Sequence, residues 1–187
     1  LNINADLSAV NLSGLAGLGL SLGAGVDLAV SSTADLSASN GSLNMAADAT
    51  VTATGHARLA AVGDIILGVV TASQVSLLAT GLISDAQAVG DTTMNVVASA
   101  LRVNADGWGT TANAVEFSVP LLSAAVGKQG MVAASLGNVD LGITAAISVN
   151  RVQANGTSWV AVSDDAQTGL TAVEGAINLT SGAAISM

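Results

Sequence analysis

Apolar and polar residues alternate along many short stretches of this chain. Leu18, Leu20 and Leu22 alternate with glycine and serine. The same two-residue period recurs in ATVTATG (49–55), NVVASALRVNA (95–105) and VEFSV (115–119). Successive side chains of a β-strand point to opposite faces, so this period predicts strands with one buried face. Because glycine and β-branched residues recur too often for long helices, we expect an all-β protein.

Turn-forming pairs separate the predicted strands. These pairs are Asn40-Gly41, Gly63-Asp64, Gly90-Asp91, Asp106-Gly107, Gly137-Asn138 and Asn155-Gly156. Between them, apolar runs recur about every 20 residues, a spacing within the range of solenoid repeats. The segments 64–86 and 92–114 show the repeat most clearly: a strand, a corner of small residues, a second strand and a glycine-containing turn. This organisation predicts a parallel β-helix (a β-solenoid) of about nine turns stacked about 4.8 Å apart.

One segment departs from the repeat. In ISVNRVQANGTSWVAVS (147–163), apolar and polar residues alternate on both sides of Asn155-Gly156, a dipeptide typical of tight hairpins. In a solenoid, this segment would be a hairpin that extends from one turn of the coil. In an antiparallel β-sandwich, the alternative fold, it would be one arm of a sheet.

The composition agrees with a narrow, regular core. Hydrophobic residues make up 51% of the chain, charged residues 9% and aromatic residues only 2%. Small and β-branched side chains must therefore fill the interior, which suits stacked turns better than an irregular core built around large rings. Serine, threonine and asparagine supply the polarity that the outer face of such a coil needs.

The charge pattern argues against several partners. The net charge is −9, and the four basic residues lie singly along the sequence: Arg58, Arg102, Lys128 and Arg151. Without a basic patch, we expect neither nucleic-acid binding nor attraction to anionic membranes. The apolar segment 13–30 is interrupted by glycine and serine and contains Asp27, so we expect no membrane span. No cysteine is present, which excludes disulfides.

Residues that could support catalysis or bind a metal ion are few. His56 is the only histidine, and without a nucleophile motif nearby we interpret it as a solvated turn residue. Glu116 and Glu174 are the only glutamates, and no pair of acids stands out for glycoside cleavage. The adjacent Asp164 and Asp165 are interpreted as a solvated corner, with calcium binding at such acidic turns as the alternative. We therefore expect no catalytic, cofactor-binding or metal-binding residues.

Two further features have simpler explanations than a ligand site. The glycines of GLGLSLG (17–23) miss the spacing of a dinucleotide-binding loop and precede no predicted helix. Trp108 and Trp159 both lie near turns, where we expect each to cover an apolar corner; contact with a glycan or a neighbouring chain is the alternative.

Two motifs in the second half resemble repeats of filamentous-haemagglutinin-like adhesins and related giant bacterial surface proteins. The first is a turn that leads into an apolar strand, and the second is a hairpin followed by a Gly-Ala-Ile strand. The matching positions are Gly109, Ala112, Asn113 and Glu116, then Val149 to Val152, Asn155 to Thr157, and Gly175 to Ile177. The resemblance covers roughly residues 50–187, and Ala114 stands where these repeats usually have proline.

The resemblance implies a right-handed parallel β-helix, secretion to the bacterial cell surface, and a role in adhesion, fibres or biofilm. We expect one solenoid segment over residues 1–187, with Leu/Gly-rich first turns at 1–42 and adhesin-like turns at 43–187. Its expected function is structural and non-enzymatic: a stiff rod. Expected partners are further repeats or identical chains stacked head-to-tail, and surface glycans or proteins of a host or neighbouring cell. A polysaccharide-binding or polysaccharide-cleaving β-helix protein is the alternative.

Overall fold

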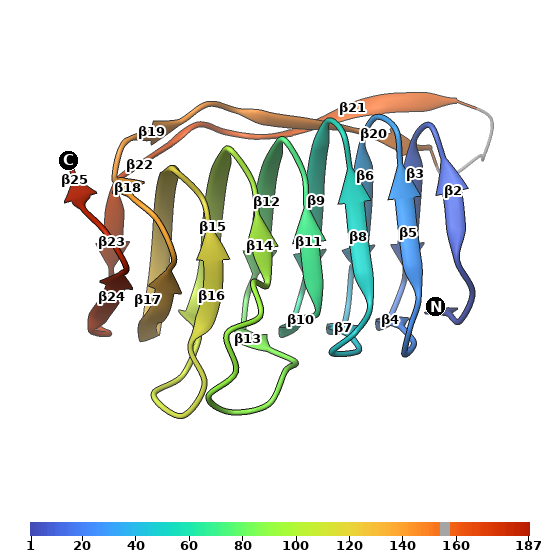
Figure 1. Ribbon diagram of the computed structural model, residues 1–187. Coiled ribbons are helices and arrows are strands. Elements are labelled where there is room, and N and C mark those ends of the chain that lie inside the picture. The colour runs from blue at the N-terminus through green and yellow to red at the C-terminus, as the bar shows by residue number, and fades with distance from the viewer. Residues whose placement is uncertain (154–157) are drawn as a thin grey trace.

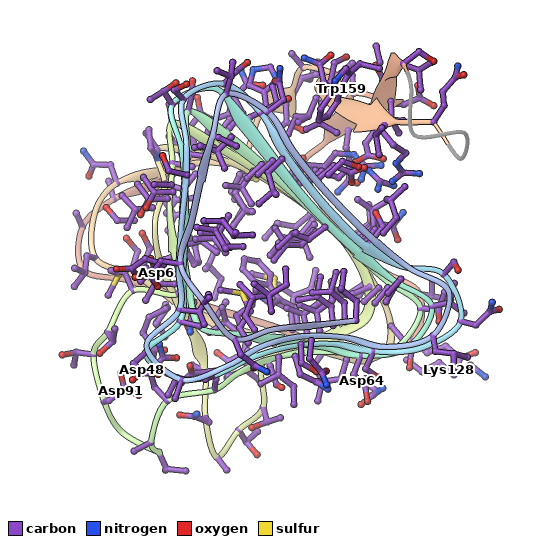
Figure 2. All side chains as sticks on the ribbon, turned by 90° about the vertical axis from the view of Figure 1, so that its right-hand side faces the viewer. Asp6, Asp48, Asp64, Asp91, Lys128 and Trp159 are labelled. Atoms are coloured by element: carbon purple, nitrogen blue, oxygen red, sulfur yellow. The ribbon has the colours of Figure 1, made fainter. Side chains whose placement is uncertain are left out.

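Parallel strands wind into a coil of triangular cross-section in the computed structural model, which describes residues 1–153 and 158–187 (Figures 1 and 2). The coil has about six turns, and its strands form one continuous 21-stranded sheet. Among the described residues, antiparallel pairing is confined to two small two-stranded sheets outside the coil. The structure thus confirms the predicted β-solenoid rather than the β-sandwich.

The coil has three faces, named here in the order in which the chain first visits them. The first face contains β1 (Asn2–Ile3), β4 (Leu20–Leu22), β7 (Leu43–Met45), β10 (Ile65–Leu67), β13 (Leu82–Asp85) and β24 (Ile177–Ser181). The second contains β2 (Leu7–Ala9), β5 (Asp27–Val30), β8 (Thr50–Ala53), β11 (Val69–Thr71), β14 (Val96–Val97), β16 (Val115–Ser118), β18 (Val139–Asp140) and β25 (Ile185–Ser186). The third contains β3 (Leu12–Ala16), β6 (Ala34–Ala38), β9 (His56–Ala61), β12 (Gln74–Ala79), β23 (Leu170–Ala172) and the first parts of β15 (Ala100–Trp108) and β17 (Leu121–Ser135).

Strand β15 continues from the third face around a corner onto the first face, and β17 continues further, until its last residues pair with β16 of the second face. The register of β15 against β17 shifts between Ala105 and Gly107, where the strand bends. The chain therefore changes direction at the predicted Asp106-Gly107 turn, but the pair does not separate two strands as expected, because a bulge changes the strand direction without ending the hydrogen-bonded ladder.

The length of one turn varies more than the sequence suggests. A short turn leads from Ala57 to its stacked partner Val75, whereas a much longer one leads from Gln74 to its partner Ala100. The predicted number of turns, about nine, is too high for two reasons. Several turns are longer than the repeat that the sequence suggests, and one long segment lies outside the coil.

Apolar side chains stack in rows inside the coil, each row from one strand position. The row of the first face is Leu20, Leu43, Ile65, Ile83, Trp108 and Met131. The row of the second face is Leu28, Val51, Val70, Val96 and Phe117. The row of the third face is Leu36, Leu59, Leu77, Val103 and Ala124. These side chains are almost completely buried. The dry core therefore extends along the coil, with each side chain packed between those of the turns before and after it.

A long excursion, here called the strap (residues 143–168), leaves the coil and returns to it. It contains β19 (Ile143–Thr144), β20 (Ile147–Val152), β21 (Trp159–Asp164) and β22 (Gln167–Thr168). Strands β20 and β21 pair antiparallel and confirm the predicted hairpin; its Asn155-Gly156 turn lies outside the described residues. In Figure 1 the strap runs across the top of the coil, back toward the N-terminal turns.

The strap is inserted into an otherwise ordinary turn. The backbone N–H of Gly169 donates to the carbonyl oxygen of Gly142 at 3.0 Å, so the two ends of the strap meet at its base. Ala124 lies before the strap in the sequence, yet it stacks directly on Leu170, which follows the strap. If the strap were removed, the turn between these two partners would be about as long as the other turns of the coil.

The apolar segment 13–30 contributes to β3, β4 and β5 of the coil. In the described residues, no helix has the length and apolar character needed to cross a bilayer.

Candidate functional site

A row of polar side chains crosses the third face beneath the strap. In register along the coil, its members are Ser13, Asp35, Arg58, Ser76, Arg102 and Ser123. Such a row would ordinarily face solvent, but β20 packs over β3, β6, β9 and β12 and covers much of it. The row and the strap together form the candidate site.

Asp35 is the centre of a buried charge cluster. Its carboxylate is fully buried and accepts hydrogen bonds from two arginines. Nη1 of Arg58, on the neighbouring turn, lies 3.2 Å from Oδ1, while Arg151 of the strap binds both carboxylate oxygens through Nε and Nη2. The hydrogen bond to Asp35 raises the pKa of Arg151. Two cations therefore share one carboxylate and join the strap to the coil.

A second carboxylate reaches the cluster from the other strand of the hairpin. Asp164 accepts from Nε of Arg58 at 2.9 Å and from the hydroxyl of Ser76 at 2.7 Å, and it is nearly fully buried. The interpretation of Asp164 and Asp165 as a solvated corner is therefore wrong for Asp164, because tertiary contact with the third face desolvates it. Asp165 is exposed, and its carbonyl oxygen accepts from Nε of Arg102 at 2.8 Å.

Polar contacts also fix the strap on either side of the cluster. The ring Nδ1 of His56 lies 2.9 Å from the carbonyl oxygen of Ser148. Since a carbonyl only accepts, Nδ1 carries the proton there. His56 is thus half-buried and bonded to the strap, not a solvated turn residue as predicted. Further along, the backbone N–H of Asn150 donates to the hydroxyl of Thr33, and its side chain donates to Asn11.

An open groove of about 390 Å³ lies on the third face beside the strap. Arg58 and Arg151 line its strap side, and Ala60, Ala61 and Leu78 are among its apolar residues. No aspartate or glutamate of the described residues lines it. The groove can therefore offer guanidinium and apolar contacts, but it lacks the paired acids that glycoside cleavage commonly uses.

A separate acidic corner surrounds Glu116, at the junction of the first and second faces. Desolvation raises the pKa of Glu116, and the negative charges of Asp85 and Asp91 raise it further. One oxygen of Glu116 and one of Asp91 are buried and have no hydrogen-bond partner among residues 1–153 and 158–187. Even so, no group of three His, Cys, Asp or Glu side chains in the part of the chain that the structure describes is arranged to bind a metal ion.

The raised pKa of Glu116 makes a testable contribution to pH-dependent stability. Because the folded state holds the proton more tightly than the unfolded state, this group favours folding at low pH. That contribution is lost as pH rises from the unfolded value near 4.5 through the raised folded value. We expect Glu116→Gln to raise the unfolding midpoint at pH 7 and to flatten its pH dependence over this window.

Thermal unfolding monitored by circular dichroism between pH 4 and pH 7 measures both effects. Glu174→Gln is the matched control, since Glu174 is largely exposed and pairs only distantly with Lys128, at 3.9 Å. Equal midpoints for Glu116→Gln and Glu174→Gln at every pH would contradict the assignment.

The remaining residues singled out in the sequence separate into core and surface. Trp108 is completely buried and packs against Phe117, with ring centroids 5.5 Å apart. Trp159 lies on the strap, outside the triangular coil, and is 50% exposed, so it does not cover an apolar corner (Figure 2). Glu116 in β16 and Glu174 after β23 lie in different elements and form no pair.

Both ends of the coil leave apolar core rows uncovered. Leu7 stacks on Leu28 in the first turn, and Ile177 and Ile185 stack on Met131 and Val139 in the last. These three side chains are 41%, 40% and 45% exposed although they continue buried rows. Within the described residues, the end strands β2 and β25 each pair with a strand on one side alone, and such a free edge can pair with a further strand.

The chain matches no protein-family model, no curated protein and no solved structure.

Proposed function

We propose that this chain is a structural β-solenoid segment of a secreted bacterial surface fibre or giant adhesin, and that it has no catalytic role. The observation that carries the proposal is the continuous parallel ladder around a dry core, which makes the fold a stiff rod. The adhesin-like motifs of the second half support the extracellular setting.

The strap supports the same proposal, because it connects turns that are far apart in the coil. Asn150 and Arg151 bond to residues in or beside the early strands β3 and β6, whereas the base of the strap is near β17 and β23. Turns of a solenoid otherwise contact only their neighbours. A strap bonded across several of them resists the opening of any one turn.

The proposal includes stacking of further turns on the coil ends, in the first instance turns of an identical chain. Leu7 and Ile177 would then be covered as Leu28 and Met131 already are. We expect the purified chain to form elongated particles whose length increases with protein concentration. Negative-stain electron microscopy and sedimentation velocity measure this.

Leu7→Lys should abolish the elongation, because a lysine in an uncovered core row cannot be buried against another turn. Leu18→Lys is the matched control: Leu18 is 74% exposed but lies in a turn outside the core rows. Circular dichroism must show that both variants remain folded. Compact monomers of the unmodified chain at all concentrations would contradict end-to-end stacking.

The groove beside the strap favours a second candidate function, binding of an acidic polysaccharide. Arg58 and Arg151 would contact carboxylate groups, and the alanine-rich floor would contact sugar rings. Titration calorimetry with acidic and neutral oligosaccharides tests this candidate, together with an assay for cleavage. Binding of the acidic oligosaccharide but not of the neutral one would support this candidate, and absence of binding would contradict it.

A further inference from the structure

Arg102 is a buried cation that forms no ion pair with any described residue. It lies in the polar row beneath the strap and is only 8% exposed. Its Nε donates to the carbonyl oxygen of Asp165, but its Nη1 is sealed from solvent and has no hydrogen-bond partner in the described part of the chain. Among the described residues, no carboxylate lies within ion-pair distance of its guanidinium group.

The neighbouring polar groups are already committed to other partners. Asp35 binds two arginines, and Asp164 binds Arg58 and Ser76. Ser123, the next member of the row, shares a hydrogen bond with Thr144. Between the strap and the third face, the described residues thus place three guanidinium groups (Arg58, Arg102 and Arg151) but only two buried carboxylates.

An excess positive charge in such a place is costly, because burial of an unpaired ion is far less favourable than burial of a paired one. A bound water could accept a hydrogen bond from Nη1, but it would leave the charge uncompensated. We propose that the guanidinium group of Arg102 binds a small monovalent anion, chloride, beneath the strap. The burial of Nη1 favours a single-atom ion over a tetrahedral one.

The chloride dependence of stability tests the site in solution. Unfolding midpoints are measured at constant ionic strength while sodium gluconate is replaced by sodium chloride. For a dissociation constant of about 1 mM, we expect the midpoint to rise by about 5–10 °C at 100 mM chloride. Arg102→Gln should remove the rise. Lys128→Gln removes the same charge from an exposed position and should keep it.

Diffraction from crystals soaked in bromide locates the ion directly. We expect an anomalous peak within hydrogen-bond distance of Nη1 or Nη2 of Arg102, absent in Arg102→Gln. The proposal is overturned if the midpoint is the same in chloride and gluconate, or if the peak is missing. It is equally overturned if Asp165→Asn lowers the midpoint while chloride has no effect, since the side chain of Asp165 would then supply the countercharge.

Discussion

Replacement of Asp35 by asparagine should lower the free energy of unfolding by about 3–5 kcal/mol, the usual cost of breaking a buried ion pair by removing one partner. The expected effect is large because Asp35 is completely buried and is the carboxylate that Arg58 and Arg151 share. Without its charge, the guanidinium groups of Arg58 and Arg151 would keep, among the described residues, only Asp164 as a nearby carboxylate. Equilibrium denaturation in urea gives the change.

Asp140→Asn is the matched control, because it makes the same chemical change at an exposed position. We expect it to change the free energy of unfolding by no more than about 0.5 kcal/mol, as surface substitutions usually do. Similar losses in both variants would mean that net charge, rather than the buried cluster, controls stability. We also expect a local effect, because Asp35 binds Arg151 of strand β20 in the strap. In Asp35→Asn, the backbone amides of β20 should exchange hydrogen faster than those of β12.

Trp108→Ala should also cost about 3–5 kcal/mol, through the cavity left by a fully buried ring. Trp108 is the largest fully buried side chain and contacts Phe117 on the next face of the same turn, so two faces of the coil lose packing at once. The backbone of a continuous ladder cannot collapse into the space without breaking its register. The free energy of unfolding, again from urea denaturation, measures the loss.

Trp108→Phe separates packing from hydrogen bonding at this position. The indole Nε1 is buried and finds no hydrogen-bond partner among the residues that the structure describes, which is itself unfavourable. Phenylalanine removes that group and keeps most of the aromatic volume, so we expect the variant to lose much less stability than Trp108→Ala. Equal losses in the two variants would show that the indole ring as a whole is required.

The strap changes what kind of rod this chain can be. A solenoid held only by contacts between neighbouring turns can open at any turn. Here the ion pairs of Arg151 and Asp164 join residues that are 116 and 106 positions apart in the sequence. The same contacts leave a groove on one side of the strap and enclose Arg102 beneath it. The structural role, the second candidate function and the anion site therefore all depend on where the strap docks.

Local sequence patterns were sufficient for the architecture. Alternation of apolar and polar residues predicted the strands, and their spacing predicted stacked parallel turns, because both depend on short-range geometry that each segment repeats. The hairpin at 147–163 was predicted for the same reason. Turn lengths were less predictable: Asp106-Gly107 resembles a turn in sequence but lies inside β15, where the extra residues 127–129 of β17 are accommodated as a bulge.

The candidate site could not be predicted from local patterns. The sequence shows Arg58, Arg102 and Arg151 as isolated cations and Asp164 as part of an acidic pair next to a turn. Stacking aligns the first two in one row, since residues one turn apart become neighbours. Only the docking of the strap adds Arg151 and Asp164 and buries the resulting charges. The chain itself determined the coil through its repeating short-range pattern, whereas the charge cluster depends on long-range contact, which no local pattern encodes.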